Sequence, residues 1–239
     1  MVDAAPVWIV LPGMTMPPED YAALAARLPG QVRVLDAYQV PLTAPAGAVR
    51  AWFQAQGAWS GVRLVGHSAG AMAALEWLLT FPDDVTAVFL LDPTDPEEKP
   101  PRFLLPGRPA HRLIGALLAL AGRWPWLARR LGRSGRRLFW GLFTKLPDPL
   151  PRAAVDRVWG HPAGLAAVWF QVFDRYNQEA RVRPLLSRLP DRPIVCLHSR
   201  AAEPYQEPLA RRLGARLSTI DGDHLFPTLL PDQTAELLA

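Results

Sequence analysis

The strongest chemical signal in the sequence is the pentapeptide Gly66–Gly70, which reads G-H-S-A-G. The residues before it, Val62–Val65, have the composition of a buried strand, and Ala69–Leu79 consists of good helix formers. Glycine on both sides of the serine removes side chains that would collide in a sharp turn from strand to helix. Such a turn would place the hydroxyl of Ser68 at the mouth of a sheet and at the N-terminus of a helix. Ser68 is therefore predicted to be a nucleophile.

With this turn, the chain resembles the α/β-hydrolase superfamily, as a serine esterase-like or lipase-like member, over nearly its whole length. The resemblance implies acyl transfer by a triad whose members follow one another in the order serine, acid, histidine. The partners of Ser68 are then expected further along the chain.

A serine hydroxyl needs an imidazole to take its proton. Of the five histidines, His224 lies after the last predicted strand, where the resemblance places the catalytic histidine, and it is the predicted base. His67 lies within the turn and is expected to point away from the serine. His198 ends a strand beside the catalytic centre, whereas His111 and His161 lie in an inserted segment.

The acid has two candidates. Superfamily members often carry it in a pattern like H-G-x-x-D, but the matching segment here begins at His198 and places Ala202 where the acid would be. Glu203 follows one residue later. Asp92 lies in L-D-P-T-D-P, which resembles a segment of pancreatic-type lipases whose aspartate is the triad acid. Asp92 is favoured, and Glu203 is the alternative.

Acyl transfer also needs two fixed N–H groups that stabilise the oxyanion. The amide of Ala69, directly after the nucleophile, is one candidate. Where the superfamily commonly has H-G-x, this chain has Pro12, Gly13 and Met14. Proline has no N–H, so the second donor is assigned to the amide of Met14.

Apolar runs alternate with helical patterns along most of the chain. Six runs are predicted as strands, at residues 7–11, 31–35, 62–65, 85–91, 194–197 and 216–220. Helices are predicted between them, among others at residues 17–28 and 208–213. Strands that are apolar throughout and separated by helices indicate an α/β fold with a predominantly parallel, doubly wound sheet. The N-terminal hairpin that the superfamily often adds is expected to be missing.

Residues 95–183 interrupt this alternation and are predicted to form an inserted helical cap, leaving 1–94 and 184–239 as the core. Residues 96–183 carry 16 Lys and Arg against 6 Asp and Glu, so the insertion is strongly basic. Within 126–143 the arginines cluster on one sector of a helix, with leucines opposite. This pattern indicates either a solvated face or a segment that contacts an anionic membrane surface. The apolar side predicts an apolar acyl pocket.

Composition and sequence motifs argue against several classes of protein. The single cysteine, Cys196, excludes a disulfide framework or a cysteine metal cluster. The N-terminus lacks the pattern of a signal peptide, and no apolar run approaches the length of a membrane span, so a soluble cytoplasmic protein is expected. The basic cluster matches no nucleic-acid-binding motif. Neither a metal nor a cofactor is expected.

The predicted function is hydrolysis of carboxylic esters, thioesters or lactones through an acyl-enzyme on Ser68, with a small-molecule acyl substrate. Two alternatives remain. One is cleavage of a carbon–carbon bond by the same triad, as a hydrolase or a lyase, and the other is ligand binding without turnover. A serine at this position argues against haloalkane dehalogenase or epoxide hydrolase chemistry, which needs a carboxylate there.

Overall fold

The fold is built on a six-stranded, all-parallel sheet. We describe it from a computed structural model that covers residues 6–59, 61–97 and 109–238. The strand order is β2-β1-β3-β4-β5-β6. The predicted sheet is confirmed, and its strands are β1 Val7–Leu11, β2 Gln31–Val34, β3 Val62–His67, β4 Val85–Leu91, β5 Ile194–Ser199 and β6 Arg216–Ile220.

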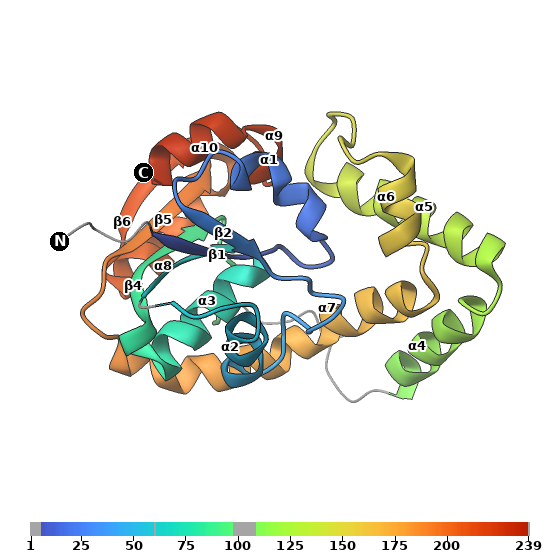
Figure 1. Ribbon diagram of the computed structural model, residues 1–239, viewed down its shortest axis with the longest axis horizontal. Helices are drawn as coiled ribbons and strands as arrows, with labels where there is room; N and C mark the ends of the chain where they lie inside the picture. Colours follow the sequence, from blue (N-terminus) through green and yellow to red (C-terminus); the bar gives the residue numbers. More distant parts are fainter. Residues whose placement is uncertain (1–5, 60, 98–108, 239) are drawn as a thin grey trace. The chain divides into compact units, whose positions relative to one another are not determined.

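Helices cover both faces of this sheet (Figure 1). One face carries α1 (Ala22–Ala25), α9 (Phe226–Leu229) and α10 (Pro231–Leu238). On the other face, α2 (Ala46–Gln54), α3 (Ala69–Thr80) and α8 (Glu203–Leu213) share one apolar cluster. The central strands are buried by helices on both sides, which explains why their sequences are apolar throughout.

Two predicted helices have different bounds in the structure. The first, expected from Pro17 to Leu28, is a 3-10 turn at Pro18–Tyr21 followed by the short α1. Helix α8 begins at Glu203, five residues before the predicted start at Pro208. Proline suits a first helical turn because its missing N–H has no partner to lose there, which favoured Pro208 as a start. Pro204 occupies that first turn instead, and Pro208 lies inside the helix.

The described residues divide into two compact units. The sheet unit comprises residues 1–98 and 178–239, and the inserted unit comprises 99–177. The inserted unit holds α4 (Pro109–Ala121), α5 (Pro125–Phe143), α6 (Arg152–Val158) and most of α7 (Pro162–Val182). The last turn of α7 belongs to the sheet unit because Arg181 pairs with the buried carboxylate of Glu76, Nε to Oε1, at 2.8 Å. No helix among the described residues is long and apolar enough to cross a bilayer.

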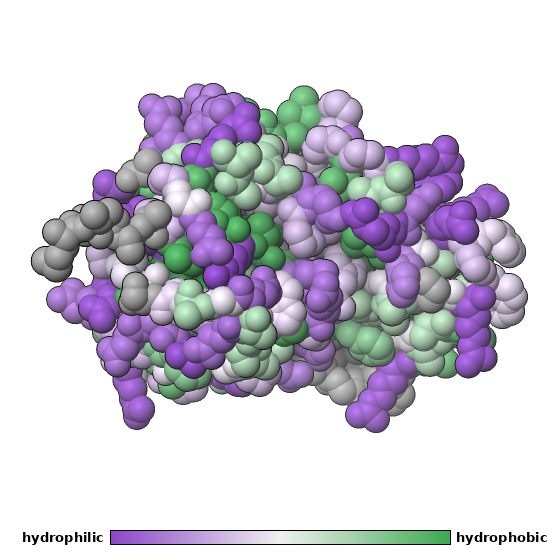
Figure 2. Space-filling view, in the orientation of Figure 1, coloured by the Kyte–Doolittle hydropathy of each residue, from purple (hydrophilic) through white to green (hydrophobic). Residues whose placement is uncertain are grey.

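Helix α5 departs from its predicted pattern. Arg136, which the periodicity places on the solvated arginine sector, is buried and pairs with Asp148. Gly132 is buried beside the end of α6, and a Cβ there would lie 2.5 Å from the carbonyl carbon of Trp159. The close approach that this glycine permits turns Arg136 inward. Two of the leucines remain largely solvent-accessible, Leu138 at 69% and Leu142 at 71%. Hydrophilic residues cover much of α5 on the visible face (Figure 2).

Candidate active site

Ser68 lies in a strained turn between β3 and α3. Its φ of 51° is in the left-handed region, which residues other than glycine rarely adopt. A Cβ on Gly66 would lie 2.6 Å from the Cα of Ala71, and one on Gly70 would collide with the carbonyl oxygen of Leu11. Both glycines are therefore required by close backbone approach. The turn is held by the amide of Ser68, which donates to the carbonyl of Leu91 at 2.8 Å.

The structure brings Ser68, His224 and Asp92 together in one hydrogen-bonded series. His224 Nε2 lies 3.0 Å from Ser68 Oγ. On the other side of the ring, His224 Nδ1 lies 3.1 Å from Asp92 Oδ2. Asp92 directly follows β4, and 1% of its side chain is exposed. A residue at the end of a rigid, central strand therefore sets the orientation of the imidazole.

Ser199, at the end of the neighbouring strand β5, supports the carboxylate of Asp92. Its amide donates to Oδ1 at 2.7 Å, and its hydroxyl donates to Oδ2 at 2.7 Å. Burial alone would raise the pKa of Asp92, but the hydrogen bonds from His224 and Ser199 outweigh it and lower the pKa below its ordinary value. The carboxylate is therefore ionised at neutral pH. It accepts the proton on His224 Nδ1 and leaves the Nε2 lone pair facing Ser68.

The alternative acid and three of the other histidines belong to other parts of the chain. Glu203 is the first residue of α8, and its side chain is outside the described ones. His198 is buried, with Nε2 3.1 Å from Thr219 Oγ1. His161 lies in the inserted unit, where its Nδ1 accepts the amide of Ala163 at 3.2 Å, and the side chain of His111 is outside the described ones. Of the histidines with described side chains, His224 contacts Ser68.

Sequence reasoning missed two supporting residues, Ser199 and Tyr21. The hydroxyl of Tyr21 lies 2.6 Å from Nδ1 of His67, and it accepts the amide of Gly13 at 2.6 Å. His67 is fully buried. Its Nε2 lies 2.8 Å from the carbonyl oxygen of His224. Ser199 could have been proposed from its place at the end of a strand beside β4. No spacing in the sequence indicates that Tyr21 would contact His67.

The two amides assigned to the oxyanion have no acceptor among the described residues. Ala69 is the first residue of α3, where a helix leaves its N–H groups unpaired. In the loop after β1, the amide of Gly13 is occupied by Tyr21, and Met16 closes a turn by donating to the carbonyl of Gly13 at 3.1 Å. The amide of Met14, between them, is left available.

A cavity of about 490 Å³ opens at this site within the sheet unit. Its lining includes Ser68, Asp92, Pro93, Thr94, Asp95, Glu97, Ala202, Gln206, Pro208 and His224. In the part of the chain that the structure describes, no group of three or more His, Cys, Asp or Glu side chains is arranged to hold a metal ion. Burial raises the pKa of the Cys196 thiol to about 12, so this cysteine is not a competing nucleophile.

Comparison with known proteins agrees with this architecture. The sequence profile of the Alpha/beta hydrolase family matches residues 4–237. No curated protein matches the sequence.

Solved structures share the fold at low sequence identity. Cfl2 from Burkholderia cenocepacia has a TM-score of 0.70 at 20% identity, covering 100% of this chain and 88% of its own. A haloalkane dehalogenase DbeA variant from Bradyrhizobium elkanii has a TM-score of 0.69 at 12% identity, with coverages of 100% and 88%. An N-formylmaleamic acid deformylase variant from Pseudomonas putida S16 has a TM-score of 0.64 at 20% identity, with coverages of 98% and 92%.

Proposed function

Because the chain belongs to the alpha/beta hydrolase family, we propose that it is a serine hydrolase that cleaves carboxylic esters, thioesters or lactones through an acyl-enzyme on Ser68. One observation supports this proposal most: the hydrogen-bonded series from Ser68 Oγ through the ring of His224 to the buried carboxylate of Asp92. This series matches the nucleophile, base and orienting acid that acyl transfer requires.

In the acylation step, Ser68 Oγ attacks the substrate carbonyl carbon while its proton passes to His224 Nε2. The negative charge of Asp92 stabilises the resulting imidazolium. The amides of Ala69 and Met14 donate to the oxyanion of the tetrahedral intermediate. When the intermediate collapses, the bond to the leaving group breaks and His224 returns the proton to the departing alcohol or thiol.

In the deacylation step, water attacks the acyl carbon and gives its proton to His224 Nε2. Collapse of the second intermediate releases the carboxylic acid and restores the Ser68 hydroxyl. The strained backbone of Ser68 keeps Oγ at the start of α3 through both steps.

The acyl group is proposed to be apolar. Leucines of two helices in the inserted unit are exposed in the described structure, among them Leu113, Leu117, Leu138 and Leu142. Apolar surface of this kind often marks a site for an apolar ligand. A serine at the nucleophile position remains incompatible with the carboxylate chemistry of haloalkane dehalogenases, so the likeness to that class is one of fold.

The test is a panel of p-nitrophenyl esters, thioesters and lactones, with 1,3-diketones as carbon–carbon substrates. We expect ester-type hydrolysis that Ser68→Ala and His224→Ala each nearly abolish, while the double variant loses little more because the triad acts as a unit. Ser187→Ala and His161→Ala, which change exposed residues outside the site, are the matched controls. Diketone cleavage without ester hydrolysis would favour the carbon–carbon alternative, and activity surviving in Ser68→Ala would refute the mechanism.

A further inference from the structure

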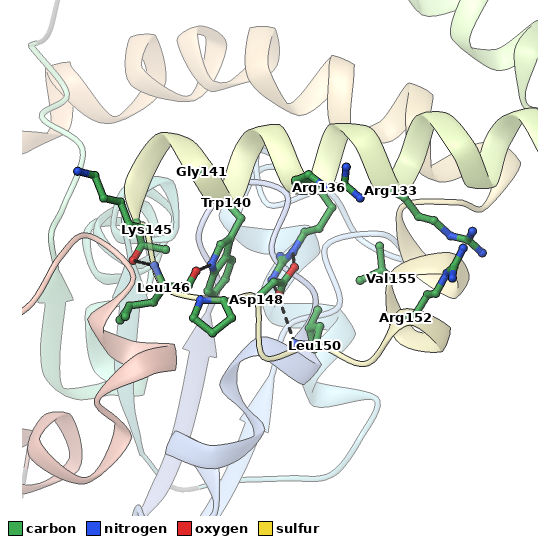
Figure 3. Close-up of a pocket in the computed structure, with 13 residues that line it drawn as sticks. Arg133, Arg136, Trp140, Gly141, Lys145, Leu146, Asp148, Leu150, Arg152 and Val155 are labelled. Atoms are coloured by element: carbon green, nitrogen blue, oxygen red, sulfur yellow. Dashed lines mark hydrogen bonds and ion pairs between the residues drawn. The ribbon is translucent and has the colours of Figure 1, made fainter.

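The inserted unit contains a second cavity, of about 610 Å³, whose lining residues all belong to that unit. It lies between the second half of α5 and the segment that leads into α6 (Figure 3). Five cationic side chains line it: Arg133, Arg136, Arg137, Lys145 and Arg152. Asp148 is the one carboxylate among the described lining residues.

An ion pair between the buried Arg136 and the partly exposed Asp148 fixes one side of this cationic cavity. Arg136, whose residue is 1% exposed, contacts both carboxylate oxygens of Asp148, at 2.7 and 2.9 Å. Its guanidinium also lies 4.6 Å from the ring centroid of Trp140. The Trp140 indole donates to the carbonyl of Leu146 at 2.9 Å, and Asp148 accepts the amide of Leu150 at 3.1 Å. Figure 3 shows the Arg136–Asp148 and Trp140–Leu146 contacts, which join the segment to α5. The cavity is therefore preorganised.

Its charge is unbalanced. Asp148 neutralises Arg136, and Asp156, on α6, forms an ion pair with Arg133. Arg137, Lys145 and Arg152 form no ion pair with any described residue, although Arg152 also acts on Asp156 electrostatically. Among the described residues of the inserted unit, these five cations therefore meet two carboxylates, an excess of three positive charges. A concave surface of this kind concentrates anions.

The remaining wall is apolar. Trp140, Leu146, Pro147, Leu150 and Val155 contribute to it. We propose that this cavity binds an organic anion in which a phosphate or carboxylate group is attached to a short apolar body. The anionic group would contact Arg137 and its cationic neighbours, and the apolar body would lie against the ring of Trp140. This ligand site is separate from the Ser68 site and does not depend on the proposed hydrolysis.

The geometry of α5 favours a soluble ligand over a membrane surface. At about 3.6 residues per turn, the exposed leucines 138 and 142 lie on the side of the helix roughly opposite Arg133, Arg137 and Trp140. If a flat bilayer contacted these leucines, the cavity would face away from the lipid headgroups. A membrane is therefore the competing outcome of the test.

Isothermal titration with n-octyl phosphate, in the Ser68→Ala background, tests the proposal. Octyl glucoside serves as the neutral ligand, and inorganic phosphate serves as the anion without an apolar body. The cavity variant is Arg137→Gln with Lys145→Gln and Arg152→Gln. Its matched control, Arg112→Gln with Arg123→Gln and Arg130→Gln, removes the same charge from exposed positions of the inserted unit outside the cavity.

We expect saturable binding of octyl phosphate that the cavity variant weakens by about tenfold or more, because it removes charge-assisted contacts to the anionic group. The control variant should change it less than about twofold. A second readout is the indole N–H resonance of Trp140, assigned with Trp140→Phe, which should shift with octyl phosphate and not with octyl glucoside. Equal weakening in both variants, no shift at Trp140, or binding only to phosphatidylglycerol vesicles would overturn the proposal.

Discussion

The ring of His67 is hydrogen-bonded to the backbone of His224, with Nε2 2.8 Å from the carbonyl oxygen. A carbonyl only accepts, so Nε2 carries the proton and Nδ1 accepts from the hydroxyl of Tyr21. The Tyr21 oxygen in turn accepts the amide of Gly13. A continuous series of hydrogen bonds therefore connects the loop of the proposed oxyanion donor Met14 to the loop of the proposed base.

Removing the Tyr21 hydroxyl should disturb both loops. Tyr21→Phe leaves the Gly13 amide and His67 Nδ1 without their partner, so we expect the free energy of unfolding to fall by about 1–3 kcal/mol. Because both loops serve the transition state, kcat for a p-nitrophenyl ester should fall about tenfold while KM changes little. Urea unfolding and steady-state kinetics measure the two effects. An unchanged kcat in a destabilised Tyr21→Phe would show that the series supports the fold and not the chemistry.

The buried state of His67 predicts how stability depends on pH. Burial and the neighbouring His224 lower the pKa of His67 from 6.5 to about 3. Between these two values the unfolded chain binds a proton that the folded chain does not. The His67 contribution is thus complete above about pH 6.5 and is lost as the pH falls towards 3, with a slope approaching about 1.4 kcal/mol per pH unit.

Urea unfolding at a series of pH values checks this prediction against His67→Gln, which keeps a donor and an acceptor and does not titrate. The wild-type protein should lose stability more steeply than His67→Gln below pH 6.5. Parallel curves for the two proteins would contradict the buried, neutral imidazole.

The identity of the triad acid can be tested by three substitutions. Asp92→Asn presents an amide to His224 Nδ1 and favours the wrong tautomer, so kcat should fall by about 10⁴. Ser199→Ala removes one donor to Asp92 Oδ2 and should cost about tenfold. Glu203→Gln should change kcat less than Ser199→Ala does. If Glu203→Gln is the more damaging of the two carboxyl substitutions, the acid has been assigned to the wrong residue.

Much of the fold followed from the sequence because its strands are buried on both faces. Val85–Leu91, for example, is apolar enough to define a strand without knowledge of its neighbours, and the observed β4 has the same bounds. The Gly66–Gly70 motif likewise carries its own steric reason, since both glycines face backbone atoms. Motif and chain order alone were enough to nominate Ser68, His224 and Asp92, which the structure brings together.

Contacts between distant segments could not be predicted in the same way. Tyr21 reaches His67 across 46 positions of the chain, and the buried Arg136 pairs with Asp148, which lies outside α5. Periodicity therefore placed Arg136 on a solvated face. The hydroxyl of Ser199 is a further example, because the sequence does not indicate that a serine at the end of a strand will donate to Asp92.

Substrate preference is expected to follow the length of the acyl chain, because the acyl group is proposed to be apolar. Across p-nitrophenyl esters from acetate to decanoate, kcat/KM should rise with chain length by up to about fourfold per buried CH₂, corresponding to about 0.8 kcal/mol. Acetate as the best substrate would contradict the apolar acyl group.

The most direct test of the central claim is covalent labelling of Ser68. A fluorophosphonate reacts with a serine only when that hydroxyl is activated, so the wild-type protein should gain one adduct, located by peptide mass spectrometry on Ser68. The adduct should be absent from Ser68→Ala, strongly slowed in His224→Ala and unchanged in Ser187→Ala. Failure of the folded wild-type protein to react, or an adduct on another serine, would contradict the proposed mechanism.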